Sequence, residues 1–265
     1  MRILFVGDIY ASPGRAIVRD HLADLAAQRG VDLLIANAEN AAAGFGITGA
    51  LAEELFALGI DVLTTGNHAW DRKEIFPYLA TAAQPNSRAA RLLRPANYPA
   101  GAPGAGLYRG TTRGGEPYVV LNLQGRVFMP ALDCPFRKAD ELLAALPAEA
   151  GAIVVDMHAE ASSEKQALGW YLDGRVSAVL GTHTHVPTAD ERLLPQGTAF
   201  QTDVGMTGAY GGVIGSRPQE VLERLLTGLP NRLEPASDDV RICATLIETA
   251  GRRATRVERV EFRAR

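Results

Sequence analysis

Short apolar runs alternate with helix signals along the first third of the chain, and this alternation constrains the fold more than any other feature. Residues 3–6 (ILFV) form a continuous apolar run, which is typical of a strand buried on both faces. Ser12 and Pro13 then predict the start of a helix, with Ser12 as its N-cap, and Gly30 ends that helix at about Arg29. Repeated strand–helix steps of this kind predict an α/β fold.

The same alternation continues along the rest of the chain. Further strands are expected at 32–36, 61–65, 118–123, 153–156 and 177–180, and further helices at 48–58, 138–146, 162–173 and 218–226. The tail over 242–262 predicts two strands joined by Gly251 and Arg252. Because no repeat, low-complexity tract or linker is present, we expect one domain over 1–265. The mixed content predicts an α/β sandwich of two sheets with helices outside.

Two local patterns lead to more specific expectations. Asp71 with Glu74 matches a capping box for the helix that follows, and Trp70 with Ile75 matches its hydrophobic staple. Residues 84–117 are rich in proline, glycine and alanine. We expect irregular loop there, with one short strand.

Composition limits the partners of this chain. The formal net charge is -3, so there is no basic excess for binding long nucleic acid. A small anionic substrate stays possible, because a metal site can supply local positive charge. Cys134 and Cys243 belong to no CxxC pair, and we expect two reduced thiols. Asp8 interrupts the apolar N-terminus and no stretch approaches the ~20 apolar residues of a membrane span, so we expect a cytoplasmic protein without a membrane partner.

Side chains of the types that bind metals follow five of the expected strands. They are Asp8, Glu39, Asn40, Asn67, His68, His158, His183 and His185. In open α/β sheets the carboxyl ends of the strands line the ligand crevice, so residues far apart in sequence can meet at one edge. Oxygen and imidazole ligands of this kind suit Mn, Fe, Zn or Co. No cysteine belongs to the set, which argues against a structural zinc site.

The histidines sharpen this prediction. Of the five in the chain, only His21 falls inside an expected helix, where a surface or half-buried position is the simplest interpretation. His183 and His185 are two residues apart, and in an extended segment both rings point to the same side and can reach adjacent metal ions. Each motif alone is weaker, because Asn67 after glycine also suits a turn and Glu39 also suits a loop. Asp156 suits either an outer partner of a metal-bound ring or a strand-end cap.

Longer blocks make a family resemblance visible. They are GDIYASPGR at 7–15, NAENAAAGFGIT at 37–48, TGNHAWD at 65–71, RPANYP at 94–99, NLQGR at 122–126, HAEASSEKQALGW at 158–170, GTHTHVPTAD at 181–190 and TDVGMTG at 202–208. In this order they resemble the calcineurin-like metallophosphoesterase superfamily. Within it, the chain is most similar to the YmdB-type bacterial 2',3'-cyclic-nucleotide 2'-phosphodiesterases, along nearly its whole length.

The resemblance implies a four-layer α/β/β/α metallophosphoesterase sandwich with two mixed sheets. It also implies two divalent metal ions, with iron or manganese as the metal. The ligands of one ion are Asp8, Glu39, Asn40 and His185, and those of the other are Glu39, Asn67, His158 and His183. His68 corresponds to the proton donor of the family. The superfamily usually begins with Asp-x-His, where this chain has Asp8-Ile9-Tyr10, and it usually has a bridging Asp where this chain has Glu39.

The expected activity is hydrolysis of 2',3'-cyclic nucleotides to 3'-monophosphates by a metal-bridging hydroxide, with His68 as proton donor. One alternative is a less selective phosphomonoesterase or nucleotidase on the same fold. Another is a metal-bound regulatory protein with incidental catalysis, although such a protein has no need of an acid at His68. The sequence leaves base preference, metal identity and a homo-oligomer open.

Overall fold

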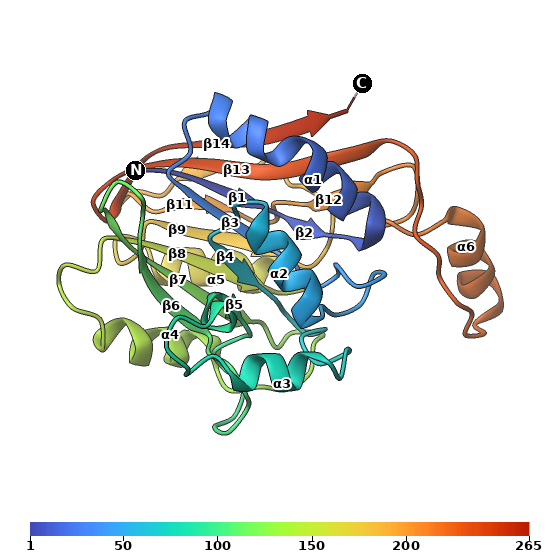
Figure 1. Ribbon diagram of the computed structural model, residues 1–265, viewed down its shortest axis with the longest axis horizontal. Helices are drawn as coiled ribbons and strands as arrows, with labels where there is room; N and C mark the ends of the chain where they lie inside the picture. Colours follow the sequence, from blue (N-terminus) through green and yellow to red (C-terminus); the bar gives the residue numbers. More distant parts are fainter. Residues whose placement is uncertain (265) are drawn as a thin grey trace.

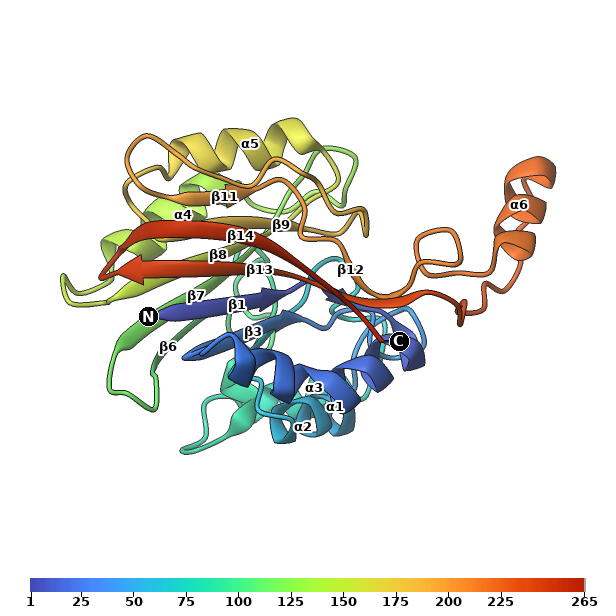
Figure 2. The ribbon, with the colours of Figure 1, turned by 90° about the horizontal axis from the view of Figure 1, so that it is seen from above.

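The computed structural model describes residues 1–264 and contains two β-sheets packed face to face (Figures 1 and 2). Within these residues, one sheet has eight strands in the order β2-β12-β13-β1-β3-β4-β5, with β14 beside β13, and the other has six in the order β10-β11-β9-β8-β7-β6. Strands of the first sheet are β1 (Arg2–Val6), β2 (Asp8–Ile9), β3 (Leu33–Asn37), β4 (Val62–Thr64), β5 (Leu92–Leu93), β12 (Met206–Ala209), β13 (Val240–Ala250) and β14 (Arg253–Arg263). Strands of the second are β6 (Leu107–Thr111), β7 (Pro117–Gln124), β8 (Ala152–His158), β9 (Ala178–Thr182), β10 (Arg192–Leu193) and β11 (Ala199–Gln201).

Helices cover the outer face of each sheet, as Figure 2 shows. The first sheet carries α1 (Ala11–Gln28), α2 (Gly49–Ala57) and α3 (Ile75–Ala80), and the second carries α4 (Pro135–Ala144) and α5 (Ser162–Tyr171). Both sheets are mixed, since β1 is parallel to β3 but antiparallel to β13, and β7 is parallel to β8 but antiparallel to β6. The predicted four-layer α/β/β/α sandwich is therefore confirmed. The remaining helix, α6 (Pro218–Thr227), projects away from this body.

The first strand shows how the sequence produces these layers. Ile3 and Phe5 point into the core between the two sheets, while Leu4 and Val6 point toward the helices of the outer layer. All four side chains are fully buried. The continuous apolar run is thus explained by burial on both faces, and full burial of one such side chain is worth roughly 1.5–3 kcal/mol.

The start of α1 differs from the prediction. Tyr10 is the N-cap, and Ser12 lies inside the first turn instead of capping it. The chain enters the helix earlier because β2 pairs with β12 up to Ile9, and the Ala11 N–H then donates to the Asn40 carbonyl at 2.9 Å. The predicted stop is correct, since Gly30 follows the helix with a φ of 61°.

The predicted capping box at the start of α3 is wrong. This helix begins at Ile75, after Glu74 as N-cap, and no side chain caps it. Asp71 instead contacts His68, as described below. Trp70 stacks on Phe76, with ring centroids 5.2 Å apart, and the expected staple is wrong because Ile75 is the first residue of the helix.

Residues 84–117 are more regular than predicted. They contain a 3-10 helix, η1 (Arg88–Arg91), and the two strands β5 and β6, where one short strand was expected. The predicted hairpin of β13 and β14 is confirmed, with Gly251 in its turn at a φ of 59°. Both cysteines are free thiols in the described part of the chain, as expected. Over residues 1–264, no helix is long and apolar enough to cross a membrane.

Candidate metal centre

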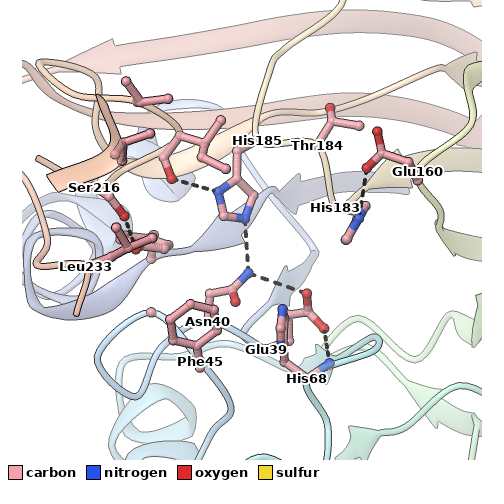
Figure 3. Close-up of a pocket in the computed structure, with 15 residues that line it drawn as sticks. Glu39, Asn40, Phe45, His68, Glu160, His183, Thr184, His185, Ser216 and Leu233 are labelled. Carbon is pink, nitrogen blue, oxygen red and sulfur yellow. Dashed lines mark hydrogen bonds and ion pairs between the residues drawn. The ribbon is translucent and has the colours of Figure 1, made fainter. Parts of the chain in front are cut away.

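The predicted site residues meet at one end of the two sheets, where strands of both sheets terminate. Asp8 begins β2, Glu39 and Asn40 follow β3, and Asn67 and His68 follow β4. From the second sheet, His158 is the last residue of β8, and His183 and His185 follow β9. The contacts described below connect all eight side chains or their backbone groups into one cluster, part of which Figure 3 shows.

Glu39 lies at the middle of this cluster. Its buried carboxylate contacts His158 through Oε1, 3.0 Å from Nε2, and accepts the His68 N–H through Oε2 at 3.1 Å. The Asn40 side-chain amide also donates to Oε1, at 3.4 Å. One carboxylate therefore touches groups on both sides of the cluster, as a bridging ligand must.

One side of the cluster centres on His158. Its Nε2 lies 2.9 Å from the Asn67 Oδ1 and 3.1 Å from the His183 Nδ1. Candidate ligand atoms of Glu39, His158 and His183 all lie within 4.8 Å of one another. These groups have the donor chemistry and spacing to surround one cation.

Asp8, Asn40 and His185 form the other side of the cluster. His185 Nε2 lies 3.0 Å from the Asn40 Nδ2 and 3.9 Å from the Asp8 Oδ1. Asp8 is completely buried, and its Oδ1 has no hydrogen-bond partner among the described residues. A buried carboxylate oxygen without a partner is costly unless a cation or donor satisfies it, so this side also fits a metal ion. A half-turn of the Asn40 amide presents its oxygen, which is the atom that a cation requires.

Each histidine of the cluster is oriented by a partner on its other ring nitrogen. His158 Nδ1 lies 2.9 Å from the Thr182 hydroxyl, which in turn donates to Asp156 at 2.7 Å. The His185 Nδ1–H donates to the Ile214 carbonyl at 3.1 Å. Outer partners of this kind fix the tautomer, so that the opposite nitrogen faces the metal. Of the two interpretations left open for Asp156, the structure supports that of an outer partner, acting through Thr182.

His183 is held in the same way from outside, since its Nε2 lies 3.1 Å from Glu160. The backbone around it is not the extended segment that was predicted. His183 has a φ of 99° and His185 a φ of 65°, both in the left-handed region that non-glycine residues rarely adopt. The two rings therefore point into different sides of the cluster because the chain turns sharply between them.

A buried network behind this turn holds it in place. Asp203 accepts the Thr184 N–H at 3.2 Å and the Thr184 hydroxyl at 2.8 Å, both on Oδ2. Lys165, from α5, pairs with the same oxygen at 2.6 Å, and both charged side chains are 1% exposed. An ion pair outside the site thus stabilises the strained backbone conformation at the two histidines.

Electrostatics in the cluster reflect its crowded charges. Burial raises the pKa of Glu39, but the charge and hydrogen bond of His158 outweigh this and hold that pKa low. Burial lowers the pKa of His158, but Glu39 reverses this and raises it. Burial, followed by the charge of His158, lowers the pKa of His183 to about 3, so its ring is neutral at neutral pH. Metal binding to these groups requires the proton on His158 to leave.

His68 lies at the rim of the cluster. Its side chain is half-buried, and its Nδ1 lies 2.8 Å from the Asp71 carboxylate, which fixes the ring orientation. The Phe45 ring packs against it at 5.1 Å between centroids. His68 also borders a cavity of about 410 Å³, which Glu39, His183 and His185 line as well.

Sequence reasoning missed several residues that shape this site. Asp71 lies three residues after His68, a spacing that brings the two together in a turn, but it was assigned to a capping box. Phe45 entered the sequence analysis only within the block at 37–48. The pairing of Lys165 with Asp203 had no local signal, because the two residues come from different elements.

Comparison with known proteins agrees with the geometry. The family model described as "YmdB-like protein" matches residues 4–260. The chain belongs to the YmdB-like family. It is 47% identical over 262 residues to a 2',3'-cyclic-nucleotide 2'-phosphodiesterase of Bacillus subtilis, a match that covers 98% of this chain and 96% of that protein.

Two crystal structures of relatives share the whole fold. A hypothetical protein from Thermus thermophilus matches with a TM-score of 0.91 and 44% identity, over 99% of both chains. A novel phosphatase from Mycoplasma pneumoniae matches with a TM-score of 0.88 and 32% identity, over 99% of this chain and 93% of that one. The resemblance and the metallophosphoesterase fold inferred from the sequence are confirmed, and so is the prediction of an enzyme.

Tyr10 occupies the position at which the wider superfamily usually has the histidine of Asp-x-His, and its contacts explain this difference. Its hydroxyl lies 2.8 Å from the Ser216 hydroxyl, and its ring contacts His185 edge-on at 5.5 Å between centroids. Tyr10 therefore packs beside a candidate ligand, with its hydroxyl engaged by Ser216. The position that holds histidine in the wider superfamily has a packing role here.

Proposed function

We propose that this protein hydrolyses 2',3'-cyclic nucleotides to 3'-monophosphates at a centre of two divalent metal ions. The observation that carries this proposal is the central position of Glu39, whose one carboxylate touches both halves of a ligand cluster with His68 at its rim. The activity named for the Bacillus subtilis relative supports the choice of substrate.

Two ligand sets follow from this position. Asp8, Asn40 and His185 would hold one ion and Asn67, His158 and His183 the other, with Glu39 shared between them. Mixed oxygen and imidazole donors favour iron or manganese. When bound, the two ions would neutralise the charge of the phosphodiester and activate water for attack.

His68 has the position of a proton donor to the leaving group. Its Nδ1 is engaged by Asp71, which leaves Nε2 as the ring nitrogen available to a ligand, and the residue lines the cavity. Its backbone N–H donates to Glu39, which fixes the distance between the ring and the cluster. A ribose oxygen is a poor leaving group, and a positioned acid typically accelerates its departure by ~10²–10⁴-fold.

Phosphomonoester hydrolysis is the second candidate, because the Mycoplasma pneumoniae relative is described as a phosphatase. The test is one metal-loaded preparation assayed with 2',3'-cyclic AMP and with nitrophenyl phosphate, followed by chromatography of the products. The proposal expects preference for the cyclic diester and adenosine 3'-monophosphate as product. A 2'-monophosphate product would refute the regiochemistry, and faster hydrolysis of the monoester would favour the second candidate.

A further inference from the structure

The cavity over the metal centre has two chemically different sides. One consists of the candidate ligands and His68, and the other of apolar side chains, of which Figure 3 labels Phe45 and Leu233. We call this second side the apolar wall, made up of Phe45, Val213, Ile214, Val221 and Leu233. Phe45 is 41% exposed and Ile214 is 55% exposed. Large apolar side chains exposed around a polar centre are a feature of ligand-binding sites.

Phe45 is held in this position by its own loop. Gly44 and Gly46 have φ angles of 95° and 76°, and the Ala42 N–H donates to the Gly46 carbonyl at 2.9 Å. Arg72 then joins the loop to the segment that carries His68, by donating to the Phe45 carbonyl at 2.9 Å and the Ala42 carbonyl at 2.6 Å. The loop that carries the aromatic ring is thereby joined to the segment of the proposed proton donor.

The position of Phe45 next to His68 suggests its role, provided that the proposed function holds. If His68 protonates the 2' oxygen of the ribose, the base is attached to the adjacent C1' carbon and must lie within a few ångströms of the same imidazole. The Phe45 ring is 5.1 Å from the His68 ring, at an interplanar angle of 73°. We infer that the apolar wall is a nucleobase subsite, in which the base stacks on Phe45.

The wall also indicates how selective this subsite is. Among the hydroxyls of the described cavity lining, those of Tyr10 and Ser216 pair with each other and that of Thr184 donates to Asp203. Glu160 is a charged side chain of the described lining that does not belong to the candidate ligands, and it contacts His183. The five side chains of the wall carry no polar group, so they cannot form hydrogen bonds with the edge of a base. Stacking is tolerant of base identity and increases with ring area, so purines are favoured over pyrimidines without strict specificity.

The test separates the base from the reacting phosphate. Phe45→Ala and Phe45→Tyr are compared with the native protein on 2',3'-cyclic AMP and on ribose 2,3-cyclic phosphate, which has no base. Loss of one base stack corresponds to roughly 5- to 150-fold, or ~1–3 kcal/mol. We expect kcat/KM of Phe45→Ala to fall on cyclic AMP, mainly through KM, by that factor more than it falls on the base-free substrate. Phe45→Tyr keeps the aromatic ring and should therefore retain the native kcat/KM on both substrates.

Phe128→Ala is the matched control, because Phe128 is 89% exposed and is not part of the cavity lining. The native kcat/KM on both substrates should be retained in this variant. Leu233→Ala tests the wall at a second position, so the inference does not depend on the folding of one variant. Equal losses on both substrates in Phe45→Ala, or full activity of both wall variants on cyclic AMP, would overturn the subsite. If the native protein hydrolyses neither of the two cyclic phosphates, the proposed function is refuted, and the subsite with it.

Discussion

Replacing Lys165 by methionine is expected to loosen the turn that carries His183 and His185. The Lys165 ammonium lies 2.6 Å from the Asp203 carboxylate, and the same oxygen of Asp203 accepts both hydrogen bonds from Thr184. The lysine stem passes close to Gly181, where an added Cβ would lie 2.8 Å from the Lys165 Cδ. Methionine preserves most of this apolar stem, so the substitution chiefly removes the charge.

The magnitude follows from the burial of the pair. Removing one partner of a buried ion pair leaves the other charge unpaired and typically costs ~3–5 kcal/mol. Total stabilities are only ~5–15 kcal/mol, so Lys165→Met should fold but unfold at a much lower urea concentration. Lys165→Met combined with Asp203→Asn should recover part of the loss, because no charge is then left buried. Both variants should bind metal ions more weakly than the native protein, since the backbone between the two histidines loses its support.

Urea unfolding of the metal-free proteins measures the first effect, and calorimetric titration with Mn²⁺ measures the second. Lys138→Met is the matched control, because Lys138 pairs with Glu141 at 2.6 Å at a more exposed position. Pairs of that kind contribute only ~0–1 kcal/mol. If Lys165→Met is destabilised no more than Lys138→Met and binds Mn²⁺ normally, the buried pair does not support the site.

Three further substitutions test individual residues of the centre. Glu39→Gln should lower the metal content of both halves and abolish turnover, and two metals per chain with normal activity would contradict its bridging position. His68→Ala should keep both metals but lose far more activity on a 2',3'-cyclic nucleotide than on bis-nitrophenyl phosphate, whose leaving group needs no acid; equal losses would exclude the acid role. Gly66→Ala would place a Cβ 2.0 Å from the His158 ring, so we expect ~1–3 kcal/mol of destabilisation and weaker metal binding, whereas native urea and Mn²⁺ titrations would show that the ring has room to move.

Patterns local in sequence predicted the layers and the location of the centre. The continuous apolar run at 3–6 indicated a strand buried on both faces, and Ile3 and Leu4 do point into different cores. Asp8 and His185 were expected to lie close together because strand ends line one crevice, and they do. Thr48, at the first residue of the helix expected over 48–58, is the N-cap of α2, with its side chain accepting from Leu51.

Features that depend on tertiary contacts could not be predicted in the same way. The left-handed backbone at His183 and His185 is supported by Asp203, and nothing in the sequence pattern indicates that these residues are in contact. Asp71 had two local options, a helix cap and a contact with His68, and the fold selects the second. The role of Phe45 depends on its contact with His68, a distant neighbour in the chain that its own loop sequence does not reveal.

The number of metal ions bound per chain tests the dinuclear centre most directly. Metal-free protein is loaded with Mn²⁺, freed of excess metal by gel filtration and measured by elemental analysis against protein concentration. The arrangement of two ligand sets around the shared Glu39 carboxylate predicts two Mn²⁺ ions per chain. A single ion, or none, would contradict it.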